Sequence, residues 1–355
     1  MKNHPRWIIR DGSEEDSEQI LSLRELVFGE FEKEKLSDQF WKWEFVDGPD
    51  GKAYIDVAVD EGNVVGHLAD IPRRFSVNGR VVLGTFSVDL MVHPDYRREG
   101  MFLKLMHYAT ERVEREKGHF RTALTIREET AAGLLKCGWK IVEALPVLVY
   151  PLRFSGIIHR YLHFSPLSLL IGGVARGGYF LFLGGKRKEK AEGIQLEEVT
   201  QLDDRFDRFY QKAMNLYAVM GIRDPAFLEW RYFKNPVRTY TFYRAIENGE
   251  MTGYLVLRKV DLLRFNSAVI VDLLALSDQA LRALIEKGIQ QGQKEGADLI
   301  GCMIPQRHPY YQVLRESGFL PSPKKFLLMV YRQRKEMVSL APETWYMNCG
   351  DTDVI

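Results

Sequence analysis

The chain has 355 residues, of which 46% are hydrophobic and 27% charged, and its net charge is +1. This composition excludes a disordered chain, and the length favours two domains because one hydrophobic core rarely serves so many residues. A net charge near zero excludes an overall field that would recruit nucleic acid, so no nucleic-acid partner is expected.

Three cysteines, Cys137, Cys302 and Cys349, are odd in number and far apart. Free thiols in a reducing compartment are therefore expected rather than a disulfide framework. No Cys/His cluster has zinc spacing, so no metal is expected. The N-terminal residues contain no apolar stretch of signal-peptide length, which favours a cytoplasmic protein.

The first part of the chain predicts short strands and helices in alternation. A strand at 7–9 precedes a helix that begins behind the N-cap Ser13, with Asp16 as its acidic third position, and continues to Val27. A compact aromatic helix is expected over 40–45. Apolar alternation and turn residues then predict strands at 53–60, 64–71 and 85–92, and a hairpin at 75–82 through its Asn-Gly turn. Apolar residues at helical spacing predict a helix over 103–117, and beyond Gly118 come a strand at 121–126, a helix at 128–136 and a closing strand at 140–150.

Residues 151–193 are rich in apolar side chains, but Arg160, Pro166 and Arg176 interrupt them. No stretch reaches the ~18 uncharged apolar residues of a membrane-spanning helix. Two interpretations remain open. The segment is either a connector between domains or an element that contacts a membrane surface peripherally through 156–188.

From Ile194 onward the pattern begins again, which indicates an internal repeat. Four aromatic and glycine positions recur 187 residues later: Phe40, Trp43, Gly62 and Gly66 correspond to Phe227, Trp230, Gly249 and Gly253. Further along, Asp89 corresponds to Asp272. We therefore predict a domain at 1–150, a connector at 151–193 and a shortened copy of the first domain at 194–355.

The stretch Val92–Phe102 (VHPDYRREGMF) ends a strand and begins a helix. A helix N-terminus directs unpaired N–H groups and the positive end of its dipole to one place, which suits a phosphate. Gly100 lets a ligand approach the backbone, and Arg97 and Arg98 add positive charge. The second copy has neither the arginines nor the glycine. We call residues 97–102 the cradle.

These residues resemble motif A of the GNAT superfamily of acetyl-CoA-dependent N-acyltransferases, which is Arg/Gln-x-x-Gly-x-Gly/Ala behind a Val-x-Pro-x-Tyr strand end. Phe102 stands where the family usually has a small residue. The resemblance implies an α/β fold of two tandem GNAT-like domains. Each would be a mixed, mostly antiparallel twisted sheet with helices on both faces.

The resemblance also implies acetyl-CoA as the cosubstrate. The backbone of Met91 and Val92 would pair with the pantetheine like an added strand. The pyrophosphate would be bound by the cradle, that is by Arg97, Arg98, Glu99, Gly100, Met101 and Phe102.

The candidate catalytic residues depart from the family's pattern. Where the family often has a tyrosine that protonates the leaving thiolate, this chain has Leu134. Asp89 lies one position from the usual carboxylate site and is either the general base or a structural residue, since the second copy keeps it. Glu128 is either a catalytic carboxylate near the incoming amine or a first-turn residue favoured by the helix dipole.

The function expected from this resemblance is transfer of an acetyl group from acetyl-CoA to a small-molecule primary amine, such as an amino sugar or a precursor of a surface polymer. One alternative is a non-catalytic acyl-CoA-binding sensor or scaffold. Another is an aminoacyl-transferase of the peptidoglycan-precursor type. For the tail 345–355, acidic residues favour solvent, whereas Trp345 and Tyr346 favour docking. The oligomeric state is not predicted.

Overall fold

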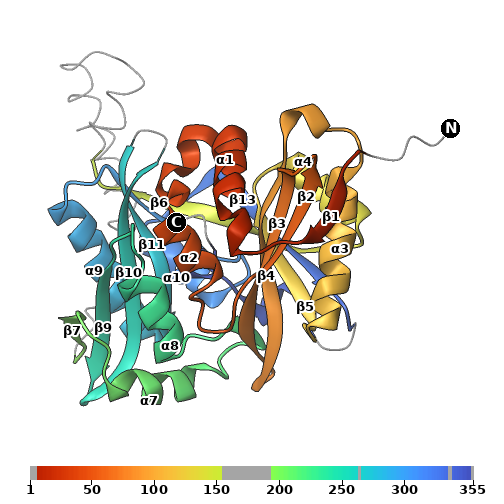
Figure 1. The fold of residues 1–355 in the computed structure, drawn as a ribbon. Helices are drawn as coiled ribbons and strands as arrows, with labels where there is room; N and C mark the ends of the chain where they lie inside the picture. Colours follow the sequence, from red (N-terminus) through yellow and green to blue (C-terminus); the bar gives the residue numbers. More distant parts are fainter. Residues whose placement is uncertain (1–5, 154–192, 263–264, 335–337, 353–355) are drawn as a thin grey trace, which may run out of the picture. The chain divides into compact units, whose positions relative to one another are not determined.

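The computed structural model describes residues 6–153, 193–262, 265–334 and 338–352 (Figure 1). The chain divides into two compact units. Unit 1 consists of 1–144, 217–238 and 326–345, and unit 2 consists of 145–216, 239–325 and 346–355. The predicted connector lies almost wholly outside the described residues. None of the helices in the described ranges is long and apolar enough to cross a membrane.

The sheet of unit 1 is mixed and mostly antiparallel, and only its neighbours β4 and β5 run parallel. In spatial order its strands are β1 (Ile8–Asp11), β2 (Tyr54–Asp60), β3 (Asn63–Val77), β4 (Arg80–Val92), β5 (Phe120–Thr125) and the C-terminal part of β13 (Leu320–Arg332). The short β8 (Val219–Gly221) pairs with β3.

Helices cover both faces of this sheet, because successive residues of a strand point to opposite sides. On one side Ala69 packs in a core with Ile20 and Trp41, and on the other Leu68 packs in a core with Met106. Figure 1 shows α1 and α3 on opposite sides of β2 and β3. The helical segments are α1 (Ser17–Phe28), the 3-10 helix η2 (Gly29–Leu36), α2 (Asp38–Phe45), α3 (Met101–Arg115), α4 (Glu128–Lys136), α8 (Pro225–Leu228) and the π-helix η4 (Glu229–Phe233).

The predicted elements of unit 1 are present, with two strands longer than expected. Ser13 caps the 3-10 turn η1 (Glu14–Asp16) that leads into α1, and the Asp16 carboxylate accepts the backbone N–H of Ser13 at 2.9 Å. The hairpin expected at 75–82 is the tip of a longer hairpin. Its first arm continues the strand expected at 64–71 as β3, and its second arm continues into the strand expected at 85–92 as β4, on either side of the Asn78-Gly79 turn. The result is one long hairpin.

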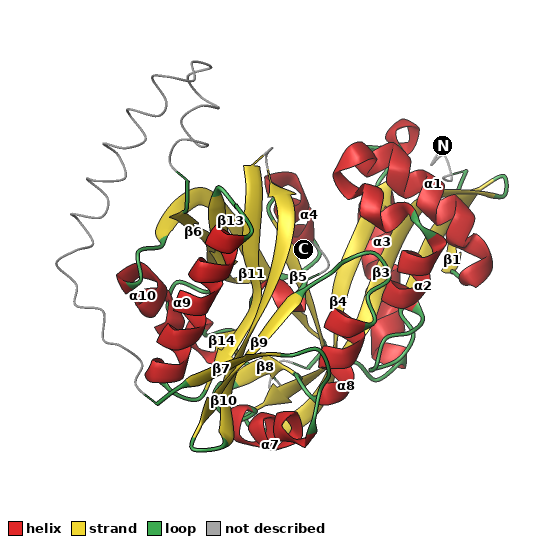
Figure 2. Cartoon of the chain, turned by 90° about the vertical axis from the view of Figure 1, so that its left-hand side faces the viewer, coloured by secondary structure: helices red, strands yellow, loops and turns green. Residues whose placement is uncertain are grey.

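The sheet of unit 2 has the corresponding strand order, and Figure 2 shows its strands β9, β10 and β11. Its parallel pair is β11 and β12. Its strands are β7 (Gln195–Glu198), β9 (Thr241–Glu247), β10 (Glu250–Leu262), β11 (Phe265–Ala275), β12 (Leu299–Met303) and the C-terminal part of β6 (Lys140–Pro151). Its helices are α7 (Asp204–Ala213), α9 (Asp278–Lys294) and α10 (Pro309–Glu316). The strand β14 (Trp345–Tyr346) lies where the chain passes from unit 1 to unit 2.

In each unit, one strand comes from the other part of the chain. The segment 140–150 was expected to close the first domain, but its residues from Val147 to Pro151 pair with β12 in unit 2. In unit 1 the corresponding place beside β5 is taken by β13. Strand pairing uses backbone groups that are the same in every residue, so sequence pattern alone does not specify which strand an edge receives.

The two long hairpins have the same register. In unit 1 His67 faces Met91 and Gly66 faces Val92. In unit 2, 187 residues after His67 and Gly66, Tyr254 faces Leu274 and Gly253 faces Ala275. Both hairpins also contain a register shift that inserts one extra residue, on β4 near Asp89 and on β11 at Val271.

Candidate functional site

The open side of β4 is the first feature of the site. Among the described residues, β4 and β5 pair only at Thr85–Arg121 and Phe86–Thr122, so the strands separate beyond this point. The N–H of His93 donates to Val65 of β3 at 2.9 Å. Since backbone groups alternate in direction along a strand, those of Val92 point away from β3, toward the open side. Val92 therefore presents an N–H and a C=O to an extended ligand, whereas Met91 faces its partner strand.

The cradle follows directly behind this edge and is exposed over residues 97–100. Arg98 and Gly100 both have left-handed backbone conformations, with φ of 70° and 79°. Left-handed residues within a turn make successive N–H groups converge into a concavity that binds anions. Gly100 is the N-cap of α3, and the first turn of that helix contains no acidic residue. Its N–H groups and dipole therefore remain available to a phosphate.

Side chains from neighbouring elements hold the cradle in place. The indole N–H of Trp7 donates to the Glu99 carboxylate at 3.0 Å. On the other side, the Tyr96 hydroxyl donates to Asp60 at 2.6 Å. Beneath the cradle, a Cβ on Gly66 would come within 2.5 Å of the Met101 sulfur, so the glycine lets the first turn of α3 lie directly on β3.

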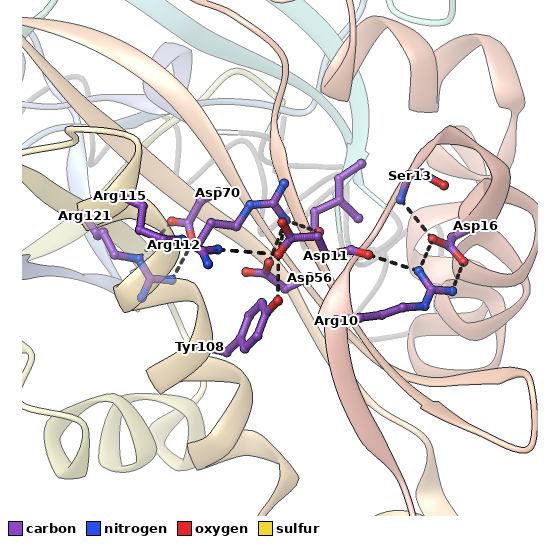
Figure 3. Close-up of polar contacts among 11 residues, drawn as sticks. Arg10, Asp11, Ser13, Asp16, Asp56, Asp70, Tyr108, Arg112, Arg115 and Arg121 are labelled. Atoms are coloured by element: carbon purple, nitrogen blue, oxygen red, sulfur yellow. Dashed lines mark hydrogen bonds and ion pairs between the residues drawn. The ribbon is translucent and has the colours of Figure 1, made fainter.

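Charged side chains behind α3 fix the rest of the helix to the sheet (Figure 3). Arg112 donates to the buried carboxylate of Asp56 at 2.8 Å. On the strands beneath, Arg121 and Asp70 form a fully buried ion pair at 2.6 Å. Burial raises the pKa of Asp56 to about 7, although Arg112 opposes this. These residues serve as anchors of α3, because they lie in its last two turns and in the sheet rather than at the cradle.

Asp89 lies at the bulge of β4 with a left-handed backbone, φ 53°. Its carboxylate accepts from Arg24 of α1, a guanidinium that also donates to Glu44 at 3.1 Å and to the carbonyl of Lys35 at 2.7 Å. Arg24, Glu44 and Asp89 are all buried. This contact favours the structural interpretation of Asp89, because its carboxylate already compensates a buried cation. The catalytic role stays a prediction.

A buried histidine lies against the same bulge. The Nδ1 atom of His67 is 3.2 Å from the Asp89 carbonyl, and this distance fits an Nδ1–H donor. Burial, and then the charge of Arg24, lower the pKa of His67 to about 3. His67 is therefore neutral and supports the bulge.

The remaining predicted residues lie around the separated ends of β4 and β5. Glu128 is exposed in the first turn of α4, directly behind β5. Leu134 is buried in the core beneath α4. Phe102 packs on the same helix, where a Cβ on Gly133 would come within 2.5 Å of its ring. The absent side chain of Gly133 explains how Phe102 fits where the family has a small residue.

Arg24 and His67 were not among the residues predicted from the sequence. A signal for Arg24 was present, since it lies three and four positions beyond Leu21 and Ile20 on the apolar face of α1. No pattern in the sequence around His67 indicated that this residue would support the bulge. In the described ranges, no group of three or more His, Cys, Asp or Glu side chains could hold a metal ion.

A family model matches the first part of the chain, and solved structures share its fold. The family model described as "Acetyltransferase (GNAT) domain" matches residues 8–131. No curated protein sequence matches the chain. A GCN5-related N-acetyltransferase from Anabaena variabilis is 16% identical, with a TM-score of 0.64 over 91% of this chain and 72% of its own.

Two further solved structures resemble the chain to the same degree. N-myristoyltransferase from Saccharomyces cerevisiae, solved with bound myristoyl-CoA, is 11% identical, with a TM-score of 0.63 over 93% of this chain and 84% of its own. A probable N-acyltransferase from Enterococcus faecalis is 10% identical, with a TM-score of 0.62 over 92% and 72%. The chain therefore has the fold of GNAT-type acyltransferases, and its residues 8–131 match the acetyltransferase (GNAT) domain family.

Proposed function

We propose that the chain is an N-acyltransferase that moves an acetyl group from acetyl-CoA to a small-molecule primary amine. Residues 1–150 would bind the cosubstrate, and residues 194–355 would be a degenerate copy without the cradle. The observation that carries this proposal is the unpaired side of β4, which ends directly at the cradle. An extended pantetheine can add to that edge while the pyrophosphate lies on the helix N-terminus.

The binding chemistry follows from these two features. Val92 would pair with the pantetheine amides, and the N–H groups from Arg98 to Phe102 would bind the pyrophosphate. A hydrogen bond to a charged oxygen contributes ~1.5–3 kcal/mol, so a few of them anchor the cosubstrate. Arg97 and Arg98 are exposed, so their positive charges can attract the anion.

The acyl-transfer step needs a deprotonated amine placed against the thioester carbonyl. Glu128 is an exposed carboxylate in the first turn of α4, behind β5, and is our candidate for accepting the amine proton, with Asp89 as the alternative. If Glu128 is the base, Glu128→Gln lowers kcat by ~10²-fold or more. A kcat unchanged in Glu128→Gln would exclude it.

A second candidate function is an acyl-CoA-binding sensor or scaffold. Two observations favour it: Leu134 lies in the core where an acid would be expected, and the Asp89 carboxylate is paired with Arg24. Release of free CoA thiol in the presence of a panel of amines separates the enzyme from the sensor.

Thermal unfolding with acetyl-CoA tests the cosubstrate. A ligand at about a hundred times its dissociation constant adds ~2.7 kcal/mol to the free energy of unfolding, so the melting temperature rises. In Gly100→Trp the indole would fill the cradle, and the rise should disappear. Gly62→Ala is a matched control, because Gly62 also has a positive φ, 83°, but lies in the β2–β3 turn. No rise in the wild type would refute the proposal. A panel of longer acyl-CoA molecules tests the choice of acetyl.

A further inference from the structure

In unit 2, side chains of the unit itself close the strand edge that corresponds to the open side of β4. By register, Ala275 of β11 corresponds to Val92, since each faces the glycine shared by the two hairpins. The Ala275 N–H donates to the Tyr310 hydroxyl at 2.8 Å, and the same hydroxyl donates to the Ala275 C=O at 2.9 Å. One phenol therefore satisfies both backbone groups that a pantetheine amide would use.

The C-terminal segment Tyr346–Asn348 closes the next position of the same edge. The Tyr346 hydroxyl donates to the C=O of Leu273. Asn348 then donates to the Asp272 carboxylate at 2.7 Å and to the Tyr346 hydroxyl at 2.9 Å. Tyr346 and Asn348 are buried, so the tail docks in unit 2 rather than staying in solvent.

Aromatic rings fill the space around these hydroxyls. The ring of His308 lies between Tyr310 and Tyr346, with centroid distances of 4.6 and 5.1 Å. Its Nδ1 accepts the N–H of Tyr310 at 3.2 Å, which requires an unprotonated Nδ1. His308 is therefore neutral and supplies no positive charge for a phosphate.

The helix that follows this edge is also closed to an anion. In unit 1, residues 93–100 separate β4 from α3, and Gly100 caps the helix without a side-chain bond. In unit 2, only residues 276–277 separate β11 from α9. The Ser277 hydroxyl accepts the N–H of Ala280 at 3.2 Å, and Asp278 places a carboxylate in the first turn. A capped helix start beside a carboxylate does not attract a pyrophosphate.

We propose that Tyr310 and the tail segment Tyr346–Asn348 occupy, in unit 2, the place that acyl-CoA takes in unit 1, so that the chain binds one acyl-CoA per molecule. This inference rests on the proposed function, because unit 1 supplies the comparison. In this proposal the C-terminal tail acts as an internal substitute for a ligand. Its side chains bond to β11 and so complete the sheet edge of unit 2.

Isothermal titration with CoA counts the sites. The expected result is one site in the wild type and none in Gly100→Trp. Two sites in the wild type, or one site remaining in Gly100→Trp, would overturn the inference. If the wild type binds no CoA, the proposed function itself fails, and the exchange measurement described next decides on the closure of the β11 edge by Tyr310 alone.

Amide hydrogen exchange at Ala275 and Leu274 needs no ligand. Tyr310→Phe removes the hydroxyl and keeps the ring, so the Ala275 amide should exchange about five-fold faster, as expected for loss of one hydrogen bond. Tyr243→Phe is the matched control in unit 2, because that hydroxyl bonds to Gln291 at 3.0 Å and not to β11. Equal exchange of Ala275 in the wild type and Tyr310→Phe would overturn the role of this hydroxyl.

Discussion

Replacing Arg24 by methionine should destabilise unit 1 strongly. The guanidinium of Arg24 is fully buried and lies between the carboxylates of Asp89 and Glu44. Methionine keeps much of the volume but leaves two buried carboxylates without a cation. Removing one partner of a buried ion pair costs ~3–5 kcal/mol. Since whole domains are stable by only about 5–15 kcal/mol, this loss is a large share of the total.

Two further variants separate charge from packing. Arg24→Met combined with Glu44→Gln and Asp89→Asn removes all three charges and should recover most of the stability, because no unpaired charge remains buried. Asparagine also tolerates the left-handed backbone at position 89. The matched control is Arg10→Met, whose guanidinium pairs with Asp16 at 2.6 Å but is 44% exposed, so its loss should stay below ~1 kcal/mol.

Urea unfolding followed by tryptophan fluorescence measures these differences. The reasoning would be refuted if Arg24→Met were no less stable than Arg10→Met, or if the triple variant were as unstable as Arg24→Met alone. The same proteins test the role of Asp89 in turnover. If it is structural, Asp89→Asn keeps kcat within a few-fold of the wild type, whereas loss of a general base lowers kcat by ~10²–10⁴-fold.

Three further predictions follow from contacts in unit 1. Gly133→Ala should cost ~1–3 kcal/mol, because the new Cβ would lie 2.5 Å from the Phe102 ring, and adding Phe102→Leu should recover part of it in a double-mutant cycle. The pKa of Asp56 is raised from 3.8 to about 7, so the native state binds the proton more tightly and its stability should fall as the pH rises from about 4 to 7. Asp56→Asn should flatten that slope in urea titrations at several pH values, and an unchanged slope would assign it to another group. Trp43→Phe removes a 2.9 Å hydrogen bond to the Trp230 carbonyl and should lower the urea midpoint by the equivalent of ~1 kcal/mol. An unchanged midpoint would show that this hydrogen bond contributes nothing to stability.

The tryptophans of the repeat show how far sequence pattern reaches. The spacing of 187 residues between Trp43 and Trp230 indicated equivalent positions. In the structure their rings stack at 4.7 Å, and each indole N–H donates to the other residue's carbonyl, at 2.9 and 3.0 Å. The spacing could indicate corresponding positions, but the contact between the two tryptophans within unit 1 is visible only in the structure.

The sequence by itself determined the features that depend on neighbours along the chain. The cap at Ser13, the Asn78-Gly79 turn, the glycine start of α3 and the register shared by the two hairpins all follow from turn chemistry and from side-chain periodicity. Each needs only a few consecutive residues, so its physical cause is local.

Only the tertiary structure decided which distant groups meet. It paired Arg24 with Asp89, placed Phe102 against Gly133, exchanged the last strands of the two sheets, and put the tail hydroxyl of Tyr346 on β11. Backbone groups and charges accept any partner of suitable chemistry, and their partner is set by the path of the whole chain. That is why the cradle could be recognised from its residues, whereas the closed edge of unit 2 could not.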